Sequence, residues 1–427
     1  MQSTNTIEGT ELIELSEETV RQLSKVKGEP EWLLHTRLEA LREFEQLPMP
    51  LLSYGLHVNA SLNISLKELK PLEHVTKHAA QATADAEGIV IEDLSDAAVK
   101  HEGMLKPLLQ RKGFQNKLEA MHAAFWNNGI FVYAKNSAEN EGKARKIQLL
   151  LKQKQTEIAW VVVVAEENSG INVTESLVSE FVHEGQSRGR DYRVEVVDVF
   201  AGQGTKVKYA TLQRLGSNVQ SLISRNAAAE NGAAVDWIDV NIGGGCTKQE
   251  IVSVLNGEGA SSTMLGAFFG DEAQQLDIMT KAVHNARNTT SNMKIKGALK
   301  GRAKAIVQSF TKIMANAAGS EGHQKANVLL LSDTARASPI PKLEIDNYDV
   351  KASHEASVGQ LDKDKLFYMM SRGLDGKDAV KLVVEGFFEP LLKQIPFEEL
   401  TEDLRQTIAA KMETAGQEIM AAANSNG

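Results

Sequence analysis

Short runs of β-branched and aliphatic residues recur through the middle of the chain, from about residue 155 to residue 350. Gly, Asn, Asp and Ser separate the runs, and one separator is the triple glycine at 243–245. Such runs are typical of strands, and the separators are typical of turns. The sequence therefore predicts a mainly β core. The expected strands include 158–164, 171–175, 193–200, 206–212 and 235–242.

Two architectures fit a core of this kind: a β-sandwich and a solenoid of stacked coils. Periodicity alone does not choose between them, because both repeat a strand and a turn. The regular strand spacing and an aromatic content of only 5% favour the solenoid, since each coil buries aliphatic side chains in layers.

Helical and mixed segments flank this core on both sides. Apolar residues at helical spacing predict the helices, and Asp362 is a candidate N-cap for the first helix after the core. We therefore expect an N-terminal helical and mixed region, a β core and a C-terminal helical region, at residues 1–150, 151–350 and 351–427. The expected flanking helices are 11–25, 31–46, 105–126, 363–372, 377–392 and 398–423, and the expected flanking strands are 88–91 and 129–133.

The charge balance restricts the partners of the chain. Lys+Arg 47 against Asp+Glu 56 gives a formal net charge of -9, which repels phosphate backbones, so we expect no nucleic-acid partner. The first residues are polar, and the longest apolar run, at 158–165, is far shorter than the about 20 residues that span a bilayer. The composition therefore predicts a cytoplasmic protein without membrane contact.

A single cysteine, Cys246, excludes a disulfide within the chain and any all-thiolate metal site supplied by this chain alone. We interpret the triple glycine before it as a tight turn and its thiol as a small hydrophobe. The chain has no Walker A sequence, so we do not expect it to hydrolyse ATP. A carbohydrate-active β-solenoid enzyme is a rival interpretation, with Asp236 and Asp239 beside Trp237 as its carboxylates.

The most specific pattern lies between residues 343 and 388. This segment contains DVKASHEASVGQLD at 349–362, LFYMMSRGL at 366–374 and AVKLVVEGFF at 379–388. In this order and spacing it resembles the SufB/SufD family of iron-sulfur cluster assembly proteins. Runs near the N-terminus (29–50), at 235–239 and at 327–332 are similar to the family as well, so the resemblance covers the chain from end to end.

The resemblance implies a right-handed parallel β-helix between helical regions, in agreement with the predicted solenoid. The family supplies two related, non-catalytic scaffold subunits that pair through their β-helices, and each docks a SufC ATPase on its C-terminal helical region, here about 362–392. The side chains expected to contact the ATPase are Leu366, Phe367, Tyr368, Arg372, Val384, Phe387 and Phe388.

One position favours a SufD-type subunit. SufB-type chains carry a ligand cysteine just after a Gly/Ser-Asp-Arg step, whereas this chain reads SDTAR at 332–336, with alanine in place of the thiolate. His354 stands where SufD-type proteins place a histidine implicated in binding the nascent cluster, and Glu355 follows it.

The resemblance implies that His354 is an iron ligand and that Glu355 is a second candidate ligand of a transient iron-sulfur cluster, shared with a SufB-type partner. A neutral imidazole binds iron through one nitrogen while an acceptor holds its other N–H. Sulfur would come from a cysteine desulfurase system, and reduced flavin is associated with the complex in the family. Two alternatives stay open: a SufB-like or homodimeric scaffold, and a His354 that only terminates the last coil.

Overall fold

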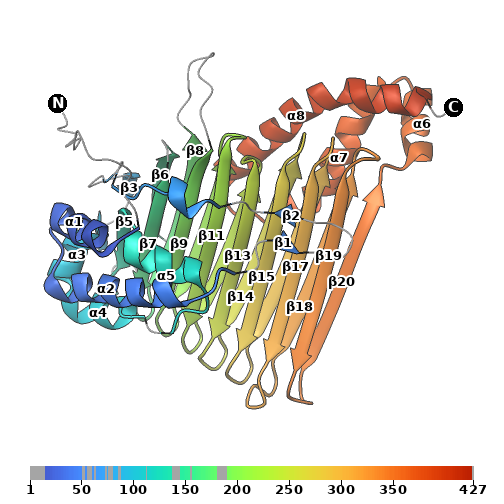
Figure 1. The fold of residues 1–427 in the computed structure, drawn as a ribbon. Helices are drawn as coiled ribbons and strands as arrows, with labels where there is room; N and C mark the ends of the chain where they lie inside the picture. The colour runs from blue at the N-terminus through green and yellow to red at the C-terminus, as the bar shows by residue number, and fades with distance from the viewer. Residues whose placement is uncertain are drawn as a thin grey trace.

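Two nine-stranded, mainly parallel sheets form the centre of the molecule, and successive strands from β5 onward alternate between them (Figure 1). The chain therefore winds as a β-solenoid, which confirms the predicted fold class. The computed structural model describes residues 15–50, 53–54, 60–61, 64–72, 75, 80–84, 88–111, 113–136, 145–153, 156–179 and 190–425.

The two sheets are named sheet 1 and sheet 2 below. Sheet 1 consists of β3 (Ala80–Ala84), β6 (Arg145–Gln153), β8 (Gly170–Ser179), β10 (Lys206–Arg214), β12 (Ala234–Asn241), β14 (Ser261–Gly270), β16 (Thr290–Leu299), β18 (Glu321–Leu330) and β20 (Lys351–Gln360). Sheet 2 consists of β4 (Ile89–Asp93), β5 (Asn128–Ala134), β7 (Glu157–Ala165), β9 (Asp191–Ala201), β11 (Val219–Ala229), β13 (Cys246–Leu255), β15 (Gln275–His284), β17 (Lys304–Ile313) and β19 (Arg336–Ile345).

Each predicted strand overlaps an observed one. The run at 158–164 lies in β7, and the run at 235–242 overlaps β12. The parallel strands extend beyond the expected core, from β5 to β20, so the last coil passes the expected boundary at residue 350. The division of the chain into three regions stays a prediction.

Strand after strand, alternate side chains face the interior. β11 shows the pattern most regularly, because every second residue from Val219 to Ala229 is buried. Pairing is in register from coil to coil, as in Val207↔Val235 and Val235↔Ser262. A parallel ladder of this kind places one interior side chain directly above the next. Each interior position therefore has to fit its neighbours in the coils above and below.

Gly297 illustrates this constraint. It pairs with Phe268, whose ring is fully buried, and a Cβ added at Gly297 would lie 1.9 Å from Phe268 Cζ. A large side chain in one coil thus requires a missing side chain in the next.

The corners between strands use left-handed backbone. Gly319 has φ 74° and donates its N–H to Asp349 O in the next coil, and Asn288 has φ 57° at the corresponding corner of the coil before. Glycine and asparagine adopt this conformation at little cost, which explains why they separate the strands in the sequence.

The N-terminal region covers one end of the β-helix (Figure 1). Its helices are α1 (Glu17–Lys27), α2 (Glu31–Gln46), α3 (Leu94–Lys100), α4 (Glu102–Leu109) and α5 (Lys117–Phe125). The buried Arg37 of α2 donates to both carboxylate oxygens of Glu29 and to the carbonyl oxygens of Ala124 and Trp126, at 2.7 to 3.0 Å. The helix expected at 31–46 coincides with α2, whereas the single helix expected at 105–126 is two helices, α4 and α5.

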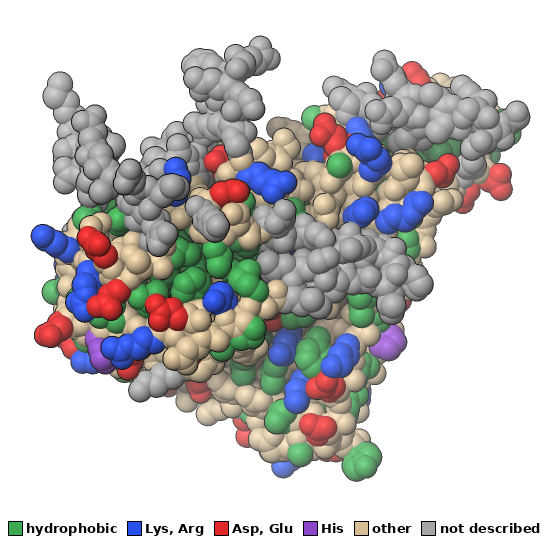
Figure 2. Space-filling view, in the orientation of Figure 1, with side chains coloured by type: hydrophobic (Ala, Val, Ile, Leu, Met, Phe, Trp, Pro, Cys, Tyr) green, Lys and Arg blue, Asp and Glu red, His purple; other side chains and the backbone are tan. Residues whose placement is uncertain are grey.

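Two short elements complete this region. The 3-10 helix η1 spans Leu66–Glu68, and β1 (Ser53–Tyr54) pairs antiparallel with β2 (Ala60–Ser61), which contacts β15 and β17. Figure 2 shows acidic and basic side chains interspersed over the N-terminal helices.

Three helices follow the last strand: α6 (Lys363–Ser371), α7 (Gly376–Leu392) and α8 (Glu398–Ser425). Asp362 caps α6 by accepting a hydrogen bond from Lys365 N at 3.0 Å, as the sequence predicted. Apolar side chains of α7 and α8 pack on the outer face of sheet 1, where Val384, Phe388 and Leu404 join Val240 and Leu265 in one core. Of the described helices, none is long and apolar enough to cross a membrane.

Gly297→Ala should lower the free energy of unfolding by about 1–3 kcal/mol, because the new methyl group overlaps the Phe268 ring and the packed coil cannot move away. Gly359→Ala on β20 is the matched control, since a Cβ there meets nothing within 4 Å. Urea denaturation followed by circular dichroism measures both. Equal stability of the two variants would show that the interior is not closely packed at this position.

Candidate functional site

The two ends of the β-helix differ. At the first end, β3 and β4 pair antiparallel with β6 and β5, and helices cover the coil. At the other end, β19 and β20 are the outermost strands of their sheets. Nearly every residue of β20 is exposed, on both faces of the strand. Outermost strands of this kind present unpaired backbone N–H and C=O groups and can pair with another chain.

The last coil, which contains β19 and β20, is called the open coil below. His354 lies on β20, directly opposite Gln324 of β18. The residues on either side of it face outward: Ser353 Oγ hydrogen-bonds with His323 Nδ1 (2.8 Å), and Glu355 forms an ion pair with Lys325 (2.9 Å). Because side chains alternate along a strand, His354 belongs to the inner face, above the buried Gln324.

Glu355 is therefore not brought together with His354. Its side chain is on the outer face, where a hydrogen bond from Lys325 lowers its pKa. The two candidate ligands are adjacent in sequence, but the regular strand points them in opposite directions. Glu355 is consequently not the acceptor that would orient the His354 ring.

The expected ATPase-contacting side chains separate into two groups. Phe367 and Tyr368 on α6 are 74% and 57% exposed, and Arg372 lies over the Tyr368 ring at 5.2 Å. Val384 and Phe388 on α7 are fully buried against sheet 1, and Leu366 and Phe387 are partly buried there. The first group is available to a partner, whereas the second anchors the helices.

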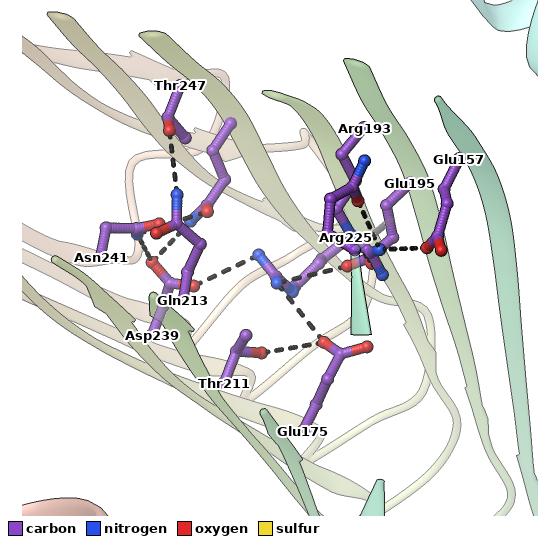
Figure 3. Close-up of polar contacts among 12 residues, drawn as sticks. Glu157, Glu175, Arg193, Glu195, Thr211, Gln213, Arg225, Asp239, Asn241 and Thr247 are labelled. Carbon is purple, nitrogen blue, oxygen red and sulfur yellow. Dashed lines mark hydrogen bonds and ion pairs between the residues drawn. The ribbon is translucent and has the colours of Figure 1, made fainter. Parts of the chain in front are cut away.

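Sequence reasoning missed a cluster of charged side chains inside the β-helix (Figure 3). Arg193 pairs with Glu157 at 2.8 Å and with Glu195, while Arg225 pairs with Asp239 at 3.2 Å and lies 3.6 Å from Glu175. All of these side chains are almost completely buried. The signal that could have found them is charge at inward positions of apolar strands, as in Arg193 and Glu195 flanking Val194.

The cluster contains more carboxylates than arginines, and this affects protonation. Burial, and then the charge of Glu195, raises the pKa of Glu175 from 4.5 to about 7, although Arg225 and Arg193 oppose the shift. Burial also raises the pKa of Asp239. Among the described residues, Oε1 of Glu195 and two Arg225 nitrogens are buried without a hydrogen-bond partner, although Arg225 and Glu195 form an ion pair at 3.5 Å.

Cys246 occupies a different part of the molecule. It begins β13 after the triple glycine, which is a tight turn as predicted: Gly244 has φ 81°, and a Cβ on Gly245 would lie 2.2 Å from Ser217 O. The thiol is buried and borders a cavity of about 460 Å³. Burial and then the charge of Asp277 raise the pKa of Cys246 to about 12, so the thiol is protonated at neutral pH.

The carboxylates of the rival carbohydrate-active enzyme do not form a pair. Asp236 is on the outer face of β12 in an ion pair with Lys208 (2.9 Å). Asp239 is buried on the inner face with Arg225. Two carboxyl groups on opposite faces of one strand cannot act on one glycosidic bond, so the structure gives this alternative no support.

The described residues contain no group of three or more His, Cys, Asp and Glu side chains that could hold a metal ion. Ala335, the residue in place of the SufB-type thiolate, is fully buried in the turn before β19. The described inner face of the open coil thus presents a histidine and no thiolate.

The fold and the open coil define a β-solenoid protein with an exposed terminal edge. Residues 149–387 match the model of the SUF system FeS cluster assembly SufBD core domain, and the chain belongs to this family. It is 26% identical over 442 residues to an iron-sulfur cluster assembly SufBD family protein of Staphylococcus haemolyticus, covering 93% of each chain. It is 25% identical over 441 residues to the iron-sulfur cluster assembly protein SufB of Bacillus subtilis, again covering 93% of each.

These comparisons confirm the family resemblance and place the chain in iron-sulfur cluster assembly. They do not distinguish a SufD-type from a SufB-type subunit.

Glu175→Gln should gain stability relative to the wild type as the pH rises from about 4.5 to 7. The raised pKa means that the unfolded chain ionises Glu175 first, so the wild type loses folding free energy in this window and the variant loses none at this position. Urea denaturation of both proteins at pH 5, 6, 7 and 8 measures the difference. A variant that instead loses relative stability with rising pH would show that the arginines stabilise an ionised Glu175.

Proposed function

We propose that this chain is a cytoplasmic, non-catalytic scaffold subunit of the SUF complex, of SufD type, which pairs with a SufB-type subunit through its open coil. The observation that carries the proposal is the unpaired edge of β19 and β20 with His354 on its inner face. Edge strands from a second β-helix would extend both sheets by main-chain hydrogen bonds. His354 would then lie within the interface.

The cargo of such an interface is a transient iron-sulfur cluster. Iron in these clusters is usually held by thiolates, and Cys246 is on β13, several strands away from β19 in sheet 2. The SufB-type partner would therefore supply cysteine, while His354 supplies a nitrogen. Glu355 remains a candidate ligand from the outer face, where it would first have to leave Lys325.

We propose that the exposed side chains of α6 dock the SufC ATPase. Phe367 and Tyr368 are exposed apolar side chains of α6, and Leu374 and Leu382, which follow them in the chain, are exposed as well. The helix after α6, α7, is fixed to sheet 1 by its buried side chains and by Lys296, which donates to Phe387 O and lies 4.5 Å from the Phe387 ring centroid. Movement of the docked ATPase would thus be transmitted to the β-helix through α7.

The family resemblance also implies a sulfur source and a cofactor of the complex. Sulfur would reach the SufB-type partner from a cysteine desulfurase system, and reduced flavin would associate with the assembled complex. The N-terminal region would cap the β-helix, the core would carry the interface, and the C-terminal region would bind the ATPase.

A second candidate function is a SufB-like scaffold or a homodimer without a separate partner. The similarity to SufB of Bacillus subtilis favours it. The composition of the purified complex separates the two. One copy of this chain with one SufB-type subunit supports the SufD-type role, whereas a homodimer that holds iron and sulfide supports the alternative.

His354→Ala should leave assembly intact and lower the bound iron and sulfide several-fold, because the exposed side chain contributes a ligand and little packing. The variant is co-expressed with the SufB-type and SufC partners, and the complex is analysed by size exclusion and by iron and sulfide determination. His323→Ala is the matched control, since His323 faces outward on the neighbouring strand. Undiminished iron in the His354 variant would leave His354 a structural role, and failure of the wild type to bind either partner would overturn the scaffold proposal.

Phe367→Asp should weaken SufC binding by at least ~10-fold, as expected when a charge replaces a central aromatic contact. Val99→Asp on α3 is the matched control, because Val99 is 57% exposed but lies in the N-terminal region. Affinity is measured by calorimetry with purified SufC. Equal affinity of the two variants would place the ATPase elsewhere on the molecule.

A further inference from the structure

Gln324 lies on β18 directly opposite His354 and is 4% exposed. Its amide connects the two sheets at the open coil. Nε2 donates to Thr311 Oγ1 of β17 at 2.8 Å and to the backbone oxygen of Lys342 on β19 at 3.0 Å. Both N–H groups of the amide are therefore used in holding β17 and β19 to sheet 1.

These two contacts determine which way the amide points. A backbone carbonyl oxygen can only accept a hydrogen bond, so the group that faces Lys342 O has to be the NH2 of Gln324. The amide oxygen is thereby fixed in the opposite direction. Oε1 of Gln324 is buried and has no hydrogen-bond partner among the described residues.

A buried acceptor without a partner is destabilising, and proteins rarely leave one without a reason. The neighbours of Gln324 in its interior column are Met293 in the coil below and His354 in the coil above. The thioether of Met293 has no hydrogen to donate, whereas the imidazole of His354 has an N–H in every protonation state. In this column, His354 is thus the side chain able to satisfy Oε1.

We propose that Gln324 is a positioning residue for His354: its Oε1 accepts one ring N–H, which fixes the tautomer and orientation of the imidazole and leaves the other nitrogen for iron. The inference rests on the proposed function of His354 as a ligand of the cargo cluster. It assigns to Gln324 the orienting contact that Glu355, on the opposite face of the strand, does not provide.

The physical advantage of this contact is that the His354 ring already has the orientation needed for binding before iron arrives. Adjacent parallel strands lie about 4.8 Å apart, so a glutamine and a histidine at paired positions can reach each other without backbone movement. A neutral amide acceptor orients the ring without adding a charge to the interior. Loss of an orienting acceptor of this kind typically costs 10–100-fold in metal affinity.

The test uses Gln324→Met, which keeps the volume and removes the acceptor, and Thr311→Val as the matched control. Thr311→Val removes one of the two hydrogen bonds that Nε2 makes but keeps Oε1, so the effect of losing that bond between the sheets appears in both variants. The first readout is the ¹⁵N NMR spectrum of histidine-labelled full-length chain, with His354→Ala identifying the signals of His354.

We expect one neutral tautomer of His354 in the wild type and in Thr311→Val, and a mixture of tautomers in Gln324→Met. The second readout is the nitrogen hyperfine coupling of the reduced cluster in the complex with the SufB-type and SufC partners, together with its iron content. The coupling should be present in the wild type, absent in His354→Ala and weakened or heterogeneous in Gln324→Met, with iron content at least several-fold lower.

The outcomes separate the two proposals. If His354→Ala keeps the coupling and the iron, His354 is not a ligand and the proposed site fails. If His354→Ala loses both the coupling and the iron while Gln324→Met matches the wild type in tautomer, coupling and iron, the ligand role of His354 is supported and the positioning role of Gln324 is overturned. Equal changes in Gln324→Met and Thr311→Val would show that Gln324 only holds the coil together, which also overturns the inference.

Discussion

In-register stacking of parallel coils is the constraint on which the rest of this structure depends. Each interior side chain lies above the same position of the coil below, so volume and polarity have to match along every column. Phe268 against Gly297 shows the match of volume, and the proposed contact between Gln324 and His354 would match a polar group in one coil with a partner in the next. Stacking also leaves an unpaired edge at each end. Helices and antiparallel strands cover the first edge, while β19 and β20 remain open, and this is why the proposed interface lies there.

In the charged cluster inside the β-helix, stacking of the coils places oppositely charged side chains together, which offsets the free-energy cost of burying them. Ionised side chains are expensive to bury unless they are paired, and here carboxylates from β7, β8, β9 and β12 surround the guanidinium groups of Arg193 and Arg225. Pairing of strands in both sheets brings these groups together from positions far apart in the chain. Burial, and then the charge of Glu195, raises the pKa of Glu175, so the interior is sensitive to pH at a distance from the open coil.

The C-terminal helices combine buried and exposed apolar side chains. The inner faces of α7 and α8 complete the core on sheet 1, whereas α6 directs Phe367 and Tyr368 to the surface. A helix that is anchored on one face and exposed on the other can transmit the movement of a bound partner into the sheet. The open coil and α6 adjoin each other in the chain, because only Leu361 and Asp362 separate β20 from α6.

The sequence by itself determined the mainly β core, most of its strands, the cap of α6 and the family, because these depend on local patterns: β-branched runs between Gly and Asn turns, an Asp before a helix, and a motif of contiguous residues. The choice of a solenoid over a sandwich came from the family resemblance, since both architectures repeat a strand and a turn. It also predicted His354 and Glu355 as candidate ligands, but not that alternation along a regular strand sends their side chains to opposite faces. Charge at inward positions of apolar strands could have indicated the Arg193–Arg225 cluster, but neither its pairs nor the contacts of Gln324 can be assigned from sequence, since most of their partners lie one or more coils away. Only the tertiary structure, by setting the register between coils, decided which polar side chains meet inside the β-helix and which edge stays open.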